Sequence, residues 1–461
     1  MSMKLHNLWK LGIFVLMTFS ITMCTDDEVD SIVQSTASFN HEVALDWNLV
    51  MLDLERFTPG YRPPVSARNI AYISLTAYES VVNGMTDEYR SIADLYPGLD
   101  VPNIERGSEY HWPTVLNAAY ARSMSLFFPT APFEYASKIQ ITETQFNNAF
   151  IDQVTQEVFN RSQEYGREVA NAVYAWSVTD TPGHEAYLRP HPTDYVPPSG
   201  PGLWQPTYPD YTRALFPYWG SVRRFAVSQD EMRVKDPLPY STNPNSDIYI
   251  QARETQITIN QIKSGQKYEE RWIADFWSDD CAAKTFSPAG RWIAVANQVV
   301  DKENVDLATA VYTYAKVGMA LADAGIACWH EKYRFNYQRP IDYIRQVMGD
   351  NNWNSIMCPD GSEFYTPPFP AYPSGHATFG GAATEVLSNI YGYSYSMTDN
   401  CHLGRTDFIS TPRTFNTFYE MAEENAFSRI PIGVHFRMDS EQGLLLGYRV
   451  GRSVNRLPWK R

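Results

Sequence analysis

The chain has 461 residues, of which 44% are hydrophobic and 20% charged, so it can bury a large core and is not disordered as a whole. The formal net charge of -14 disfavours non-specific binding to nucleic acid or to anionic lipid, because both are polyanions. We expect no nucleic-acid partner, and a site for an anion must be a local cluster of cations.

The first 24 residues have the pattern of an export segment. Lys4 and Lys10 precede an apolar run from Leu11 to Met23, and Cys24 follows it. This run is too short to span about 30 Å of hydrocarbon as a helix. A signal peptide is therefore favoured over a short anchor that is not cleaved. We expect an exported protein that is periplasmic, associated with the outer membrane as a lipoprotein, or secreted.

Cys24 and the acidic residues after it resemble the lipidated cysteine of bacterial lipoproteins, although Met23 stands where a small residue is expected. Attachment to a membrane is expected only through a lipid anchor at Cys24. The predicted organisation is an export segment at 1–24, a polar linker at 25–40 and a helical domain at 41–461. The sequence does not indicate an oligomeric state.

Helical periodicity dominates after residue 40, and alternating strand patterns are scarce. Trp47, Val50 and Leu54 recur at helix spacing. Further amphipathic stretches lie at 66–84, 112–127, 147–178, 249–263, 266–277 and 289–301. The longest apolar stretch, 305–328, is apolar nearly all round and predicts a central buried helix. The fold class expected is all-α, a single large helical bundle.

Between these stretches lies an irregular insertion, about 179–245, that is rich in Pro, Tyr and Trp. A long ordered loop of this kind commonly covers a site or an interface, and the alternative is a surface excursion with no task. The sequence leaves the two interpretations equal.

Besides Cys24 the chain has Cys281, Cys328, Cys358 and Cys401. Export would permit disulfides among them, and their pairing stays open. No CxxC pair exists, so a zinc ribbon or a thioredoxin-type site is not supported.

Three short segments of the C-terminal third carry the residues that predict chemistry. They hold Trp329, Lys332 and Arg339, then Phe369, Ser374, Gly375 and His376, then Arg429, His435 and Asp439. Three cations beside a buried helix are costly unless an anion neutralises them. Arginine offers a planar fork that matches tetrahedral oxyanions. The pattern therefore predicts an oxyanion site in the core of the bundle.

The residues around the two histidines suggest different tasks for them. Ser374 and Gly375 would place a hydroxyl and an unobstructed N–H at the start of a helix, which favours an anion. If 435–439 is helical, Asp439 lies one turn from His435 and can hold its Nδ1 proton, which leaves Nε2 to bond a metal or phosphorus atom. His376 would exchange a proton with the bound oxyanion.

Each segment alone is weak, since Pro-Ser-Gly-His is more often a simple helix start and a lone arginine is more often a solvated surface charge. Together, K-x6-R-P, P-S-G-H and S-R-x5-H-x3-D resemble the signature of a superfamily. It joins type 2 phosphatidic acid phosphatases, bacterial acid phosphatases and vanadium haloperoxidases. Trp329, Phe369 and the form of the segment Gly433–Asp439 resemble the haloperoxidases more than the phosphatases. The length, the export segment and the insertion resemble the bacterial iodoperoxidase branch.

The resemblance implies vanadate, V(V), as the cofactor and hydrogen peroxide and halide as substrates. It implies a vanadium bond from His435, oriented by Asp439, with the vanadate oxygens held by Lys332, Arg339, Ser374, Gly375 and Arg429. His376 would take the peroxide proton and Lys332 would polarise the bound peroxide. Trp329 and Phe369 would wall the halide pocket, and iodide is favoured over bromide because algal bromoperoxidases tend to have His where Phe369 stands. Core packing is the alternative role of both aromatic residues.

The segment Trp277–Asp280 resembles the region where relatives supply a carboxylate that orients one of the arginines. We expect Asp280 rather than Asp279 in this role, although a helix N-cap would explain either.

Two other functions stay open on the sequence. A phosphomonoesterase of the acid phosphatase or phosphatidic acid phosphatase type would use His435 as the nucleophile that forms a phosphohistidine, and His376 to protonate the leaving group. A lipid-anchored binding protein with a relic pocket would bind phosphate or vanadate without turnover of either kind.

Overall fold

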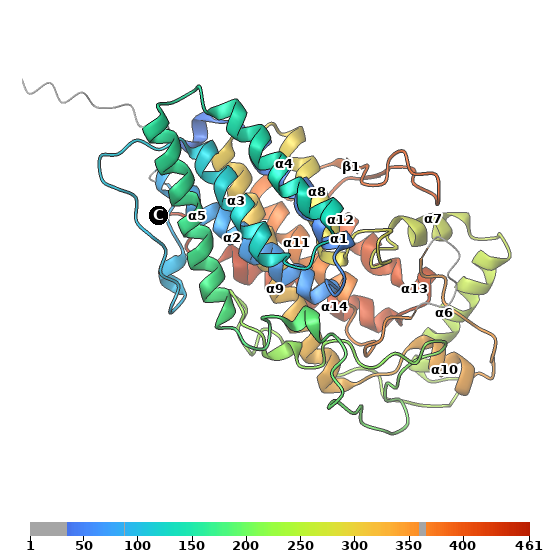
Figure 1. The fold of residues 1–461 in the computed structure, drawn as a ribbon. Helices are drawn as coiled ribbons and strands as arrows, with labels where there is room; N and C mark the ends of the chain where they lie inside the picture. Colours follow the sequence, from blue (N-terminus) through green and yellow to red (C-terminus); the bar gives the residue numbers. More distant parts are fainter. Residues whose placement is uncertain (1–34, 87, 359–365) are drawn as a thin grey trace, which may run out of the picture. The chain divides into compact units, whose positions relative to one another are not determined.

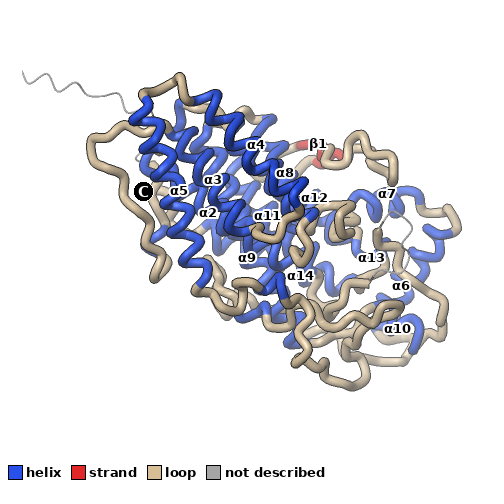
Figure 2. The backbone as a smooth tube through the Cα atoms, viewed as in Figure 1, coloured by secondary structure: helices blue, strands red, loops and turns tan. Residues whose placement is uncertain are grey.

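The computed structural model describes residues 35–86, 88–358 and 366–461, so the predicted export segment and most of the predicted linker lie outside the described residues. Helix makes up nearly all the regular structure of the described residues, which confirms the all-α prediction (Figure 1, Figure 2). The described strands are β1 (Met397–Asp399) and β2 (Arg413–Phe415), which pair antiparallel. None of the described helices combines the length and apolar composition that a membrane span requires.

The helices of the described ranges are α1 (Glu42–Phe57), α2 (Pro63–Val81), α3 (Trp112–Phe127), α4 (Phe133–Phe150), α5 (Gln156–Val178), α6 (Asp247–Lys263), α7 (Tyr268–Phe276), α8 (Pro288–Lys302), α9 (Leu307–Phe335), α10 (Pro340–Gln346), α11 (Gly375–Tyr391), α12 (Phe418–Phe427), α13 (Arg429–Ile432) and α14 (Arg437–Asn455).

Helix α9 forms the centre of the bundle and packs against α2, α11 and α14 (Figure 1). Every residue from Ala310 to Trp329 is buried, which confirms the predicted central helix. The Asp306 carboxylate caps its start by accepting from Thr309 N at 2.7 Å. The helix ends at Asn336, which has the left-handed conformation common at helix C-termini.

Helices α11 and α14 approach each other so closely that side chains are excluded from part of their interface. A Cβ atom at Gly447 would lie 2.3 Å from Thr378 O, and one at Gly443 would lie 2.5 Å from Ser374 O. Only glycine fits at such distances. The contact at Gly443 brings the N-terminus of α11 beside the first turns of α14, which places two of the predicted site segments together.

The predicted helical stretch at 147–178 is wrong at its beginning, because two helices share this part of the chain. Helix α4 ends at Phe150, and Thr155 caps α5 by accepting from Val158 N at 3.3 Å. The sequence pattern does not indicate the start of α4, because Phe133 and Ile141 are 88% and 63% exposed. Exposed apolar residues blur the periodicity that marks an amphipathic helix.

The insertion 179–245 contains only short 3₁₀ turns, η4 (Ala186–Leu188) and η5 (Trp219–Ser221). The Asp323 carboxylate of α9 anchors it by accepting from the backbone N–H groups of Phe225, Ala226 and Val227 at 2.7–2.8 Å. Further along, Trp204 N donates to Asn336 O at 2.6 Å. The insertion therefore lies against the C-terminal part of α9, which favours the interpretation that it covers a site.

The buried Glu79 carboxyl of α2 makes the stability of the fold depend on pH. It accepts from Ser91 Oγ at 2.6 Å and from Ile92 N at 3.0 Å, and burial raises its pKa from 4.5 to about 7. The folded state therefore binds this proton more tightly than the unfolded state does. The resulting stabilisation is complete below pH 4.5 and is lost as the pH rises through about 7.

We expect Glu79→Gln to remove this dependence, since a neutral amide keeps both contacts. Between pH 5 and pH 8 the free energy of unfolding of the wild type should fall, relative to the variant, by about 3 kcal/mol. Urea unfolding at both pH values measures this. Glu134→Gln, at an exposed position of α4, is the control, and its stability should change with pH as that of the wild type does. If the free energies of unfolding of wild type and Glu79→Gln differ by the same amount at pH 5 and pH 8, the assignment is wrong.

Candidate active site

The predicted site residues come from the ends of several helices that meet in the bundle. Trp329 and Lys332 lie near the C-terminus of α9, Arg339 caps α10, Ser374 caps α11 and Gly375 begins it, Arg429 begins α13, and His435 lies two residues before α14. Helix ends leave N–H and C=O groups without partners inside the helix. The geometry thus gathers polar backbone groups around buried side chains.

The three predicted cations are fully buried and are bound mainly by backbone carbonyls. Lys332 Nζ donates to Pro370 O and Ala371 O at 2.8 Å each. Arg339 Nε donates to Phe369 O at 2.9 Å and its Nη1 to Val434 O at 2.8 Å.

Arg429 Nη1 donates to Trp277 O at 2.9 Å. In the described ranges no carboxylate forms an ion pair with Lys332 or Arg429, although Asp279 and Asp280 favour the charged form of Arg429 from a greater distance.

The cations lie close enough to disfavour one another's charge. Burial, with smaller contributions from Arg339 and Arg429, lowers the pKa of Lys332 to about 7. Burial also lowers the pKa of Arg429 to about 9. An anion among them would offset this cost. Among the described residues no group of three or more His, Cys, Asp or Glu could hold a metal cation. The positive charge of the cluster suits an oxyanion.

His435 has a fixed tautomer with a lone pair facing the cations. Its Nδ1 donates to Asp439 Oδ2 at 2.9 Å, and Nε2 lies 3.2 Å from Arg339 Nη1. Burial, followed by Arg339, Lys332 and Arg429, lowers its pKa well below 6.5. The ring is therefore neutral, and Nε2 is an electron-pair donor.

The predicted contact between His435 and Asp439 is present, but the reason given for it is wrong because His435 lies outside α14. Phe436 is the N-cap of α14. The Asp439 carboxylate accepts from Phe436 N at 3.0 Å as well as from the imidazole. One capping carboxylate therefore holds both the start of the helix and the histidine before it.

His376 is a second buried histidine of the site, and its two ring nitrogens also differ in their hydrogen bonding. Its ring is hydrogen-bonded to the backbone of Asp279, and its Nε2 has no partner among the described residues. The bond to Asp279 must then come from Nδ1, which leaves Nε2 as an acceptor. Burial, with Arg429, Lys332 and Arg339, lowers the pKa of His376 well below 6.5. The site thus holds two neutral imidazoles near the same cations.

Ser374 and Gly375 form the predicted helix start between these groups. Ser374 Oγ accepts from Ala377 N at 3.5 Å, a long contact, and Ser374 N donates to Asp439 O at 2.9 Å. The N–H of Gly375 lies in the first turn of α11, where the helix offers it no carbonyl. A Cβ atom at Gly375 would lie 3.5 Å from Trp329 Cζ3.

Trp329 and Phe369 form a buried aromatic pair beside the cations, with ring centroids 4.9 Å apart. The Phe369 ring faces two of the cations, Lys332 Nζ at 5.1 Å and Arg339 Cζ at 4.9 Å from its centroid. Trp329 Nε1 donates to Leu215 O of the insertion at 3.3 Å. The insertion therefore packs against the aromatic pair of the site.

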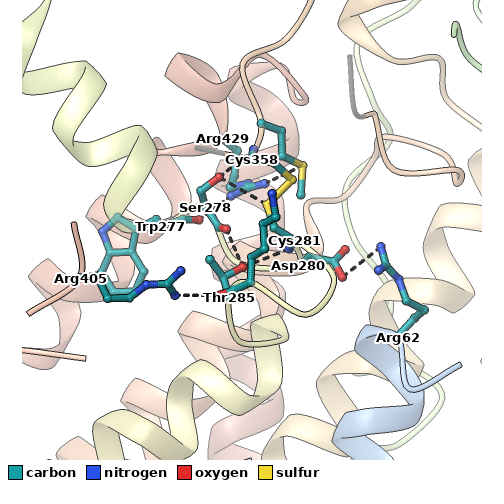
Figure 3. The surroundings of a disulfide bond; sticks show 11 residues. Arg62, Trp277, Ser278, Asp280, Cys281, Thr285, Cys358, Arg405 and Arg429 are labelled. Carbon is teal, nitrogen blue, oxygen red and sulfur yellow. Dashed lines mark hydrogen bonds and ion pairs between the residues drawn. A yellow bond between two sulfur atoms is a disulfide. The ribbon is translucent and has the colours of Figure 1, made fainter. Parts of the chain in front are cut away.

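Asp280 does not make the predicted direct pair with an arginine of the cluster. Its Oδ1 lies 3.4 Å from Nη2 of Arg62, at the N-cap of α2 (Figure 3). Asp279 has the larger electrostatic effect on Arg429, ahead of Asp280. Neither carboxylate caps a helix here, since Ser287 is the N-cap of α8.

A second buried cluster, next to Asp279, was not predicted from the sequence. Arg291 of α8 is fully buried between Phe276 and Trp277, with Cζ 4.6 Å from each ring centroid. Its Nη2 lies 2.7 Å from Asp399 Oδ2, and its Nη1 lies 3.7 Å from Asp279 Oδ1. The sequence does contain a signal for this cluster, because Arg291 lies on the apolar face of the amphipathic helix predicted at 289–301.

One disulfide, Cys281–Cys358, fixes the turn that follows Asp280 (Figure 3). Cys358 N also donates to Ser278 Oγ at 3.1 Å. Cys328 and Cys401 are free thiols.

Comparison with known proteins agrees with this geometry. A family model described as the VCPO second helical-bundle domain matches residues 312–458. The chain is 24% identical to the vanadium chloroperoxidase of Curvularia inaequalis over 505 residues, 88% of this chain and 80% of that protein. It is 34% identical to the vanadium-dependent bromoperoxidase of Ascophyllum nodosum over 113 residues, 23% of this chain and 20% of that protein.

A solved structure described as the first bacterial vanadium-dependent iodoperoxidase superposes with a TM-score of 0.78 and 28% identity, covering 91% of this chain and 96% of that one. The chain belongs to the vanadium haloperoxidase family. A holo bacterial vanadium-dependent chloroperoxidase, at 14% identity and TM-score 0.66, covering 87% of this chain and 93% of that one, shares the fold. As a family member, this haloperoxidase is a peroxidase-type oxidoreductase. Its matched segment contains every predicted site residue except Asp280.

Proposed function

We propose that this haloperoxidase oxidises iodide in preference to other halides, using hydrogen peroxide and a vanadate held by His435. The observation that carries the proposal is the neutral His435 ring. Its Nε2 faces buried cations while Asp439 holds its Nδ1. A neutral imidazole with a fixed tautomer is the form that bonds a metal centre.

The donor set fits a tetrahedral oxyanion. Lys332, Arg339 and Arg429 would neutralise its oxygens, and the Gly375 N–H and the Ser374 hydroxyl would donate to them. The weakly engaged Ser374 Oγ, at 3.5 Å from Ala377 N, has capacity for this second role. When bound, vanadate supplies Lewis-acid activation of peroxide without a change in oxidation state.

The remaining groups have separate tasks in this proposal. His376 takes the peroxide proton at its unpartnered Nε2, and Lys332 directs positive charge toward the oxygen that is transferred. Trp329 and Phe369, at most 5% exposed, exclude water. Iodide is large and weakly hydrated, so a dry aromatic wall favours it. The iodoperoxidase structure at 28% identity supports this preference.

The test is a set of initial rates on protein freed of vanadate and then reloaded. We expect activity only after vanadate is added, with iodide oxidised faster than bromide and bromide faster than chloride. Hydrolysis of a phosphate monoester by the vanadate-free protein is measured alongside. Ester hydrolysis without halide oxidation would favour the phosphatase mechanism, and a faster rate with bromide or chloride would contradict the iodide preference alone.

A further inference from the structure

Two cavities meet at Arg62, near the N-terminus of α2. The first, the insertion cavity, has a volume of about 310 Å³ and is lined by Arg62, Pro190, Tyr208, Leu215 and Pro368 among others. The second, the turn cavity, has about 290 Å³ and is lined by Arg62, Glu55, Asp280 and Phe286 among others. The Arg62 side chain is 23% exposed. An anion in either cavity is therefore close to this guanidinium.

The insertion cavity lies one layer of residues away from the aromatic pair of the site. Leu215 lines the cavity, and its carbonyl accepts from Trp329 Nε1 at 3.3 Å. Pro368 also lines it, precedes Phe369 in the chain, and accepts from Leu215 N at 2.9 Å. A solute in this cavity could therefore approach Trp329 and Phe369.

The turn cavity is lined by the carboxyl group of Asp280. Asp280 is held rigidly, since it has a φ of +78°, its N–H donates to Phe286 O at 2.8 Å, and Cys281 is tied to Cys358. Its Oδ1 is 3.4 Å from Arg62, and its Oδ2 has no hydrogen-bond partner among the described residues (Figure 3). Burial raises the pKa of Asp280 and Arg62 favours its ionised form, so an ionised Asp280 left without Arg62 would oppose halide.

Other charged groups also line the two cavities. Asp210 and His191 line the insertion cavity, and Arg56 lines the turn cavity. The Arg56 guanidinium also donates to Lys284 O. The whole protein also repels anions through its net charge of -14.

We propose that Arg62 selects the halide anion at the approach to the site, by cancelling the charge of Asp280 and presenting a guanidinium to both cavities. This inference rests on the proposed halide oxidation. The cations deeper in the site hold the oxyanion, whereas Arg62 acts on the approach of the second substrate.

The test uses the fact that halide is an anion and hydrogen peroxide is neutral. In vanadate-loaded Arg62→Gln we expect the KM for iodide to rise about threefold to tenfold, with kcat and the KM for peroxide within about twofold of wild type. Arg62→Lys keeps the charge and should stay close to wild type. Arg106→Gln, which removes an exposed arginine elsewhere, is the charge-matched control and should leave the iodide KM unchanged.

Three outcomes would overturn the proposal: an unchanged iodide KM in Arg62→Gln, a parallel rise of both KM values, or an equal loss in Arg62→Lys. A second measurement on the wild type does not depend on the variants folding. If cations dominate the approach, the iodide KM rises as potassium acetate is added, because salt screens the attraction. If it falls, the net negative charge dominates and the proposal is wrong. Absence of halide oxidation in the loaded wild type would instead refute the proposed function itself.

Discussion

His435→Ala is expected to abolish vanadate binding and halide oxidation together. The Asp439 carboxylate fixes Nδ1 at 2.9 Å, and Nε2 is the imidazole atom directed at the cations. Loss of a group that only orients a metal ligand costs about 10-fold to 100-fold in affinity, so loss of the ligand itself should cost more. Titration of the vanadate-free protein with vanadate, followed by iodide oxidation rates, measures both effects.

The matched control for this variant is His41→Ala. His41 is also buried and bonds a backbone carbonyl, Val305 O at 3.0 Å, but it lies near the opposite end of α9. We expect it to lower stability and to leave vanadate affinity and the iodide rate unchanged. Wild-type iodide oxidation in His435→Ala would show that the metal is held elsewhere.

The residues of the oxyanion cluster could be predicted because the chemistry requires certain residue types in short segments. Lys332 and Arg339 flank the end of the longest apolar helix, and Ser374 and Gly375 begin another helix. A helix start and a buried cation each require particular residue types at particular positions. These residues can therefore be identified in the sequence before their positions in space are known.

The groups that position this cluster could not be predicted, because they come from distant parts of the chain or from its backbone. His376 is oriented by a backbone carbonyl of Asp279, which no residue type reveals. Arg291 meets Asp399 across 108 residues, and Asp280 is paired by Arg62 from α2. Such pairs depend on how helices pack, and packing is not encoded in a local pattern.

The disulfide shows the same limit. Cys281 and Cys358 are 77 residues apart, and four cysteines allow several pairings. The bond joins the turn after α7 to the segment before α11. The tertiary fold brings these segments together, as the hydrogen bond from Cys358 N to Ser278 Oγ also shows.

His376→Gln is expected to separate binding from turnover. The Nε2 atom of His376 has no partner among the described residues, and its pKa is held well below 6.5 by burial and the neighbouring cations. A neutral imidazole can therefore take a proton from peroxide, which an amide cannot do. We expect the iodide rate to fall about 100-fold or more, while the affinity for vanadate stays within about tenfold of wild type because His435 and the three cations remain.

This difference distinguishes a base from a group that only binds the oxyanion. If His376 acted solely by donating a hydrogen bond to vanadate, the glutamine amide would replace that bond, and the rate and affinity would both stay near wild type. If it acted solely by supporting the fold, rate, affinity and thermal stability would fall together. A loss of turnover with retained vanadate binding is the result that proton transfer at the unpartnered Nε2 predicts and that neither alternative predicts.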